Sequence, residues 1–237
     1  LITDDASFVL TSTCDGGTAN ITGVIGGTFS FAIPPIDAAI IDPITGTVSG
    51  GTFGNTYDIL YTTSGICPGD SVQSLTALNQ DDPTFTMTPN CDGGIANVIG
   101  TTGGIFAFAV PPIDAAVIDP ISGIVSGGSF GASYDIIYTT NGTCPDSLTE
   151  NLTVLTVDDP SFIMTANCDG GIANISGTIG GTFSFAIPPG DGAIIDPITG
   201  TVTNVTNGNT YNILYTTNGA CTADSISSFT ALDADDA

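Results

Sequence analysis

The chain has no lysine, arginine, histidine or tryptophan among its 237 residues. Its 24 acidic residues therefore give a formal net charge of −24, with no cation to offset it. Binding to nucleic acid requires Lys or Arg to neutralise phosphates, so the composition excludes ordinary nucleic-acid partners. It also disfavours binding to anionic membrane surfaces.

Features that are missing from the sequence also argue against catalysis, cofactor binding and insertion into a membrane. Without His or Lys, the usual bases that activate a nucleophile are missing. No glycine-rich loop opens a helix to hold a nucleotide, and no Cys-x-x-Cys or Cys/His cluster indicates zinc. Apolar runs such as 38–41 are far too short to span a bilayer. We predict a protein that is not an enzyme, needs no cofactor and does not insert into a membrane within this segment.

The chain is acidic, but its composition does not predict a disordered protein. Only 10% of its residues are charged, 41% are hydrophobic, and the mean hydropathy is +0.37. A disordered acidic tail would be poor in Val, Ile and Phe. We therefore expect a folded protein whose surface is largely Thr, Ser, Asn and Gly.

A 77-residue period organises the sequence. Asp-Asp pairs recur with this period, and so do two separate series of cysteines. A fixed period of this size indicates an array of similar modules. We predict domains at residues 1–80, 81–157 and 158–234, with residues 235–237 beginning a further repeat. On this interpretation the chain is a segment of a longer array, without a signal peptide of its own.

Each module is predicted to be an all-β sandwich of about seven short strands. In the first module, residues 28–33 alternate so that Phe29, Phe31 and Ile33 share one face, and residues 56–62 place Tyr57, Ile59 and Tyr61 likewise. Further strands are expected at residues 7–11, 18–22 and 71–78, with a hairpin formed by 38–41 and 47–49 around an Asp-Pro turn. Such spacing of strands and turns is typical of an Ig-like sandwich.

Six cysteines divide evenly among the modules, two in each, 53 residues apart. One pair per small β-module predicts one disulfide within each module and an oxidising compartment. A bridge closing that loop would stabilise a module by about 4 kcal/mol in the chain-entropy model. The predicted disulfide residues are Cys14, Cys67, Cys91, Cys144, Cys168 and Cys221.

Three segments of the first module carry a family resemblance. They are Gly-Gly-Thr-Phe-Ser-Phe, then Ile-Asp-Pro-Ile-Thr-Gly-Thr-Val, and then Tyr-Asp-Ile-Leu-Tyr-Thr-Thr-Ser-Gly-Ile-Cys-Pro. This pattern, present three times, resembles tandem Ig-like repeats of very large secreted Bacteroidetes and flavobacterial proteins, which are surface adhesins or fibrous exoproteins. The resemblance implies Ig-like sandwiches, export to the cell surface, and adhesive or structural work without catalytic residues.

The Asp-Asp pairs are candidate calcium ligands at the module junctions. Two adjacent carboxylates, with oxygens from a neighbouring module, could hold Ca²⁺ and stiffen the joint. The alternative is a polar turn capped by an Asx side chain, which is also the interpretation of the Asp residues after the first cysteine and before Pro. The calcium candidates are Asp4, Asp5, Asp81, Asp82, Asp158, Asp159, Asp235 and Asp236.

An Asp-Ser-aliphatic tripeptide occurs once in each module. It resembles the O-glycosylation acceptor of Bacteroidetes, Asp-Ser/Thr-aliphatic, and a covalent glycan there would add bulk and solubility. The register shifts by one residue between copies, and the alternative is a plain strand start. The candidate acceptors are Ser71, Ser147 and Ser225.

Together these features predict a secreted, non-enzymatic structural protein. The low charge density and β-rich modules favour self-association into filaments, with modules docked end to end. The alternative is a rod-like stalk of a cell-surface adhesin that presents a binding tip.

Overall fold

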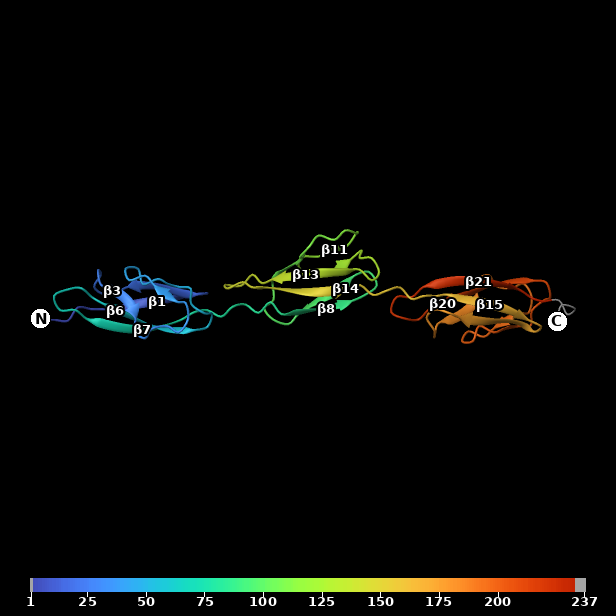
Figure 1. The fold of residues 1–237 in the computed structure, drawn as a ribbon, viewed down its shortest axis with the longest axis horizontal. Helices are drawn as coiled ribbons and strands as arrows, with labels where there is room; N and C mark the ends of the chain where they lie inside the picture. Colours follow the sequence, from blue (N-terminus) through green and yellow to red (C-terminus); the bar gives the residue numbers. More distant parts are fainter. Residues whose placement is uncertain (1, 233–237) are drawn as a thin grey trace. The chain divides into compact units, whose positions relative to one another are not determined.

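The computed structural model describes residues 2–232, and within that range the chain forms strands, turns and loops but no helix. The residues pair into six sheets, two for each of three sandwich-like modules (Figure 1). This confirms the predicted all-β fold with seven strands in each module. The last predicted segment, 235–237, with Asp235 and Asp236, lies outside the described residues.

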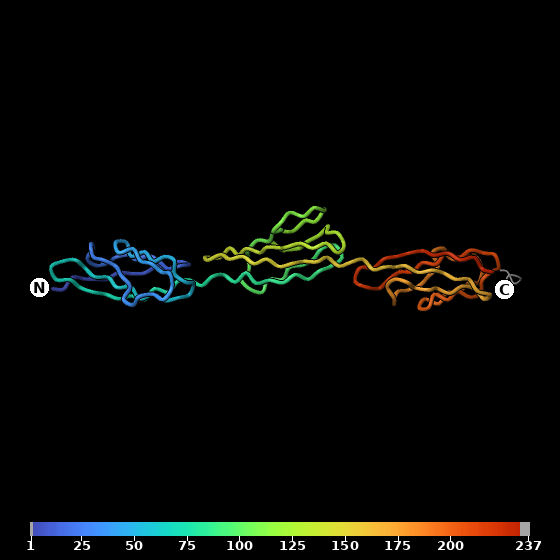
Figure 2. The backbone as a smooth tube through the Cα atoms, viewed as in Figure 1, coloured from blue at the N-terminus to red at the C-terminus, as the bar shows by residue number. Residues whose placement is uncertain are grey.

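The strands of the first module form two sheets. One has the order β1-β2-β5-β4 and the other β3-β6-β7. The strands are β1 (Phe8–Thr13), β2 (Gly16–Ile21), β3 (Thr28–Phe31), β4 (Ile40–Ile41), β5 (Val48–Ser49), β6 (Thr56–Thr62) and β7 (Asp70–Thr76). The tube in Figure 2 follows the chain from blue to teal through this module.

The other two modules repeat this topology, with sheets β11-β12-β9-β8 and β10-β13-β14, and then β15-β16-β19-β18 and β17-β20-β21. The strands of the second module are β8 (Phe85–Pro89), β9 (Gly94–Val98), β10 (Ile105–Phe108), β11 (Val117–Ile118), β12 (Val125–Ser126), β13 (Ser133–Thr139) and β14 (Ser147–Thr153). Those of the third are β15 (Phe162–Asn167), β16 (Gly170–Ile175), β17 (Thr182–Phe185), β18 (Ile194–Ile195), β19 (Val202–Thr203), β20 (Thr210–Thr216) and β21 (Asp224–Thr230).

Two compact units divide the described chain, and the division passes through the second module. The first unit holds residues 2–86, 97–107 and 137–149, and the second holds 87–96, 108–136 and 150–232. Each unit therefore contains one whole terminal module together with the segments of the second module that pack with it.

An aromatic triad joins the two sheets in the core of each module. In the first module Phe8 of β1 meets Phe29 of β3 edge-on at 5.5 Å between ring centroids, and Phe29 lies 4.5 Å from Tyr61 of β6. The Tyr61 hydroxyl donates to the carbonyl oxygen of Val24 at 2.8 Å, so its polar end is satisfied although the ring is buried. The other triads are Phe85, Phe106 and Tyr138, and Phe162, Phe183 and Tyr215.

The alternating patterns predicted most of this core. Tyr57, Ile59 and Tyr61 are all buried, as expected for one face of β6. The predicted face of β3 is only partly right, because the strand ends at Phe31 and Ile33 is exposed. Two prolines follow Ile33 directly and cannot donate to a ladder, so the chain leaves the sheet before them.

The predicted disulfide within each module is wrong. The first module shows why: Cys14 follows β1, whereas the loop of Cys67 is hydrogen-bonded to Asp4, which precedes β1. The six residues of β1 separate these positions by about 20 Å at the rise of an extended strand. A disulfide needs Cα atoms less than about 7 Å apart, so the two cysteines of one module cannot meet.

Candidate functional site

The six cysteines fall into two structural kinds. One kind lies in the turn between the first two strands of a module, and we name these the turn cysteines: Cys14, Cys91 and Cys168. The other kind lies in the loop between the sixth and seventh strands, and we name these the loop cysteines: Cys67, Cys144 and Cys221.

Each of the two disulfides joins a turn cysteine to the loop cysteine of the following module. Cys14 is bonded to Cys144 within the first compact unit, with Cα atoms 5.4 Å apart. Cys91 is bonded to Cys221 within the second unit, with Cα atoms 5.5 Å apart. Both bridges span 130 residues of sequence, so one covalent arrangement occurs twice. The module junction is therefore the candidate functional site.

The first aspartate of each Asp-Asp pair holds the loop that carries the loop cysteine. The amide of Asp81 donates to the carbonyl oxygen of Cys144 at 2.9 Å, and its carboxylate Oδ2 accepts from the amide of Gly142 at 2.9 Å. A Cβ at Gly142 would collide with that carboxylate, so a larger residue there would displace the Asp81 side chain from this position. Asp158 makes the same two bonds, to Cys221 and Gly219, at 2.9 Å each.

The second aspartate of each pair caps the start of the following strand. The Asp82 carboxylate accepts from the amide of Thr84 at 3.0 Å and also from its hydroxyl. These bonds favour the charged form, with the hydroxyl bond dominant, and hold the pKa of Asp82 below its usual value. Asp5 and Asp159 have lowered pKa values for the same reason, through Ser7 and Ser161.

This geometry bears on the predicted calcium ligands. The two carboxylates of a pair point their oxygens at different backbone donors, Asp81 at Gly142 and Asp82 at Thr84. Ca²⁺ takes six to eight oxygen ligands, commonly several of them carboxylate. Among residues 2–232 no group of three or more His, Cys, Asp or Glu side chains is placed to hold a metal. The geometry of the described residues therefore favours the alternative, a polar turn capped by an Asx side chain, and the calcium sites at the pairs are not tested by it.

The three predicted glycosylation sites do not occupy equivalent positions. Ser71 and Ser225 are the second residues of β7 and β21, whereas Ser147 is the first residue of β14. Successive residues of a strand point to opposite faces, so the one-residue shift turns Ser147 to the other face. Ser147 is exposed, while Ser71 and Ser225 are half-buried. The Ser225 hydroxyl also donates to the carbonyl oxygen of Pro160. Glycosylation at these residues stays a prediction.

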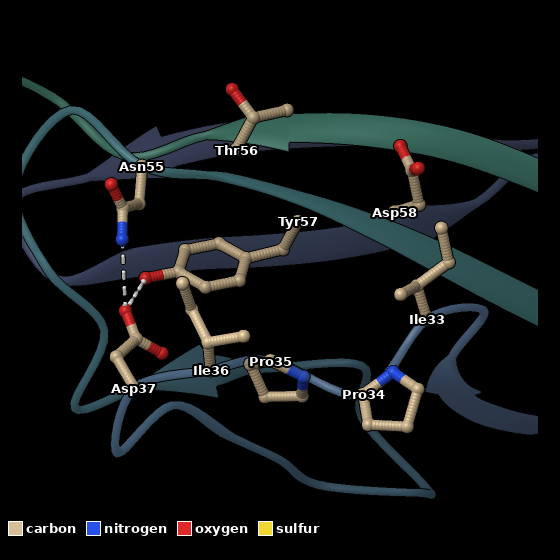
Figure 3. A pocket seen from close by; sticks show the side chains of 9 residues that line it. All are labelled: Ile33, Pro34, Pro35, Ile36, Asp37, Asn55, Thr56, Tyr57 and Asp58. Carbon is tan, nitrogen blue, oxygen red and sulfur yellow. Dashed lines mark hydrogen bonds between the residues drawn. The ribbon is translucent and has the colours of Figure 1, made fainter.

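A second recurrent feature is a shallow hollow beside an aspartate–tyrosine pair. In the first module it has a volume of about 310 Å³ and is lined by the Pro34-Pro35 segment and by residues 55–58 (Figure 3). The Tyr57 hydroxyl donates to Asp37 Oδ2 at 2.6 Å, and Asn55 Nδ2 donates to the same oxygen at 3.1 Å.

The Asp37 carboxylate accepts hydrogen bonds from four donors and thereby holds the neighbouring loop in place. The amide of Thr52 also donates to Asp37 Oδ2, at 3.0 Å, and the amide of Ala39 donates to Oδ1 at 3.1 Å. The Tyr57 hydroxyl bond is the main cause that holds the pKa of Asp37 far below its usual value. Burial, and then the bond to Asp37, raises the pKa of Tyr57. Asp114 with Tyr134 and Asp191 with Tyr211 repeat the pair at 2.5 and 2.6 Å.

The hydrogen bond between these aspartates and the tyrosines was not predicted from the sequence. The 20-residue spacing between Asp37 and Tyr57, constant in all three modules, was the available signal. The Asp-Pro turns are as predicted: Asp42 Oδ1 accepts from the amides of Ile44 and Thr45 at 2.8 Å each. Asp15 lies in the turn between β1 and β2, and its Oδ2 accepts from Gly50 at 3.1 Å.

No protein-family model matches the chain, and no curated protein is similar to it in sequence. Solved structures of cadherin repeats align with it at low similarity. Human CDH23 EC21-23 is 14% identical over 94% of this chain and 99% of that one, with a TM-score of 0.28. Mouse cadherin-23 EC22-24 is 13% identical over 98% and 94%, with a TM-score of 0.25. Drosophila N-cadherin EC1-4 is 13% identical over 90% and 69%, with a TM-score of 0.27.

Proposed function

We propose that the chain is a non-enzymatic, extracellular structural segment whose work is to link modules into a covalently reinforced fibre. The observation that carries the proposal is the pair of equivalent disulfides between consecutive modules, Cys14–Cys144 and Cys91–Cys221. A bridge inside a domain stabilises that domain, whereas a bridge between domains restricts how they move relative to each other. The repeated use of the second kind favours a mechanical role.

The bridges also change how the chain carries tension. The shortest covalent path enters at residue 1, crosses from Cys14 to Cys144, returns to Cys91, crosses to Cys221 and leaves at residue 237. That path contains roughly one third of the backbone, so at about 3.4 Å per residue the bridged chain reaches roughly a third of its full extension. Tension between the ends therefore meets a limit well before the chain is pulled straight.

Disulfides persist outside the reducing cytosol, which supports a secreted location. Among the described residues, no helix is long and apolar enough to cross a membrane. The aspartates at the junctions and in the hollows are occupied by backbone and hydroxyl donors, which supports a structural rather than catalytic use of acidic side chains. The proposal also includes self-association of the chain into filaments and covalent glycans on its surface.

The test is immuno-electron microscopy of native material with an antibody against this chain. The proposal expects labelled fibres outside the cell, with label at regular intervals, and a lower persistence length after reduction because the junctions are then freer. Label confined to the cell interior would contradict it. Short rods that each end in a different globular tip would assign the chain to an adhesin stalk instead.

A further inference from the structure

The hollow of the first module lies at a gap in the β3-β6-β7 sheet. Strand β3 pairs with β6 only over residues 59–62, and the amide of Ala32 adds one bond, to the carbonyl oxygen of Asp58 at 2.8 Å. The chain then turns away at Pro34-Pro35, which have no amide hydrogen to donate. Among the described residues, the first part of β6 therefore has no strand on this side.

The backbone of Thr56 faces this gap. Successive residues of an antiparallel strand direct their amide and carbonyl groups to alternate edges. Since the carbonyl of Asp58 points to the β3 edge, the amide and carbonyl of Thr56, two residues earlier, point there as well. The carbonyl of Asn55 points the other way and accepts from the amide of Ala77 at 2.9 Å, as this alternation requires. The gap thus offers one donor and one acceptor to an extended chain.

The same gap occurs in all three modules. The amide of Ala109 donates to the carbonyl oxygen of Asp135 at 2.8 Å, and that of Ala186 to the carbonyl oxygen of Asn212 at 2.9 Å. A pair of prolines follows each alanine closely, and hollows of about 450 and 310 Å³ lie beside β13 and β20. The backbone positions equivalent to Thr56 are Ser133 and Thr210.

The hollows of the first two modules have an exposed apolar wall. Ile36 and Ile113 line them and are fully exposed, whereas the third module has Gly190 at this position. In the first module Ile36 lies beside Pro35 and the ring of Tyr57 (Figure 3). A partner that covers this wall with an apolar side chain removes it from water, which favours docking.

A carboxylate without a cation also lines each of these two hollows. Asp58 Oδ1 accepts from the Ser74 hydroxyl at 2.6 Å, and Asp135 Oδ1 accepts from Asn151 Nδ2 at 3.0 Å. Both donors are neutral, so the negative charges stay uncompensated, whereas the third module has the neutral Asn212 here. The complementary cation has to come from another protein, because a second copy of this chain has no Lys, Arg or His.

We propose that the hollows of the first two modules bind an extended segment of another protein, in which one basic residue stands between two apolar ones. The segment adds a strand at the gap, with its main chain bonded to Thr56 or Ser133. A basic residue opposite Thr56 lies diagonal to Asp58, at about 7–8 Å, which Lys or Arg can reach. The residues on either side point to the opposite face, toward Ile36 and Tyr57. This goes beyond the proposed function, because it gives the chain a partner of opposite charge.

The probe is the peptide acetyl-Ser-Val-Lys-Val-Ser-amide, titrated into the whole isotope-labelled chain and followed by NMR. The proposal expects saturable shifts of the backbone amides of Thr56 and Ser133 and much smaller shifts of Thr210. A peptide with norleucine in place of lysine should bind up to about fivefold more weakly, the upper range for one exposed ion pair. The lysine peptide methylated on its lysine backbone nitrogen keeps the charge but loses the main-chain donor, and should shift these amides far less.

A double variant separates charge from the shape of the hollow. Asp58→Asn with Asp135→Asn gives the first two modules the residue that the third module has at this position. It should weaken binding of the lysine peptide up to about fivefold and leave binding of the norleucine peptide unchanged. Amide signals that stay in place outside the hollows confirm that the variant is folded.

Four results would overturn the proposal. Equal shifts in all three modules would mean general attraction of a cation to the acidic chain. Equal binding of the lysine and norleucine peptides would remove the role of charge. A lysine peptide that shifts none of these amides would mean that the gap accepts no strand. Shifts at Thr56 that appear when the chain is concentrated without peptide would mean that a second copy fills the gap.

Discussion

The backbone amide of Asp81 donates a 2.9 Å hydrogen bond to the carbonyl oxygen of Cys144, so the residue that starts the second module also fixes its loop cysteine. The side chain of Asp81 adds a second bond, to Gly142 two residues before that cysteine. The Asp-Asp pair and the cysteine series share a period because they belong to one junction. The first aspartate of the pair thus positions the loop whose sulfur bonds to the preceding module.

Replacing Asp81 by Ala should weaken formation of the Cys14–Cys144 bridge. The variant loses the carboxylate bond to Gly142 and keeps the backbone bond, so the loop should be less well ordered before oxidation. A loss of roughly 1 kcal/mol, typical of one hydrogen bond, lowers the bridge-forming population about fivefold. Peptide mass spectrometry after brief oxidative refolding measures the two bridges separately.

The equivalent variant of the next junction is the matched control. Asp158→Ala should slow the Cys91–Cys221 bridge and spare Cys14–Cys144, the reverse of Asp81→Ala. Equal slowing of both bridges by either variant would show that the aspartates act on folding in general and not on their own loops.

Removing the central ring of the first aromatic triad should unfold that module selectively. Phe29 is buried between Phe8 and Tyr61, so Phe29→Ala leaves a cavity and should destabilise the module by about 3–5 kcal/mol. Val72→Ala, at a side chain that is 52% exposed, should change stability by less than about 0.5 kcal/mol. Calorimetry should show one shifted transition. A uniform shift of the whole profile would contradict modules with separate cores.

Acid should destabilise the fold even though it reduces the net negative charge. The tyrosine hydroxyl bonds depress the pKa values of Asp37, Asp114 and Asp191 in the folded state. Since these groups bind protons more readily when unfolded, their stabilisation is present above the unfolded pKa of about 4 and is lost as pH falls through the lower folded values. Melting temperatures should therefore fall steadily between pH 5 and pH 2.

The triple variant Asp37→Asn, Asp114→Asn, Asp191→Asn isolates this effect. It should lower the melting temperature at pH 7 and flatten the decline below pH 4, because the amides do not titrate. An unchanged acid profile in the variant would assign the decline to other carboxylates, such as the strand caps of the Asp-Asp pairs.

Calcium should leave the melting temperature unchanged relative to a chelator. The junction carboxylates already accept bonds from backbone amides and from the Thr84 hydroxyl, and Ca²⁺ would have to break these to coordinate them. Magnesium at the same ionic strength controls for screening of the −24 charge. A melting temperature raised by calcium and not by magnesium would establish the calcium site that the Asp-Asp pairs suggest in the sequence.

The sequence predicted the fold well because its signals are local. Alternation placed Tyr57, Ile59 and Tyr61 in the core, and Asp-Pro with a closing Gly marked the hairpin of β4 and β5. These features depend on a strand's two faces and on turn chemistry, both of which act over a few residues. The predicted strand bounds of the first module lie within two residues of the observed ones, and the strand expected at 28–33 runs two residues past the end of β3 at Phe31.

The disulfide pairing could not be predicted from spacing, because similar repeats offer Cys14 and Cys91 a loop cysteine both in their own module and in the next. The choice depends on which end of the sandwich each cysteine occupies. A clue was present, since the strand predicted at 7–11 lies between the Asp4-Asp5 pair and Cys14. Recognising it required knowing that Asp4 binds the loop of Cys67, a contact 63 residues away in sequence.

The central claim is that the bridges join consecutive modules, and cyanogen bromide tests it most directly. The two methionines, Met87 and Met164, allow cleavage into residues 1–87, 88–164 and 165–237, each with two cysteines. Cleavage in acid prevents disulfide exchange, and a reduced sample reports how complete it is. Bridges between modules predict that the three fragments stay together without reductant and separate only after reduction. Three separate fragments before reduction would show that no bridge joins consecutive modules and would contradict the account.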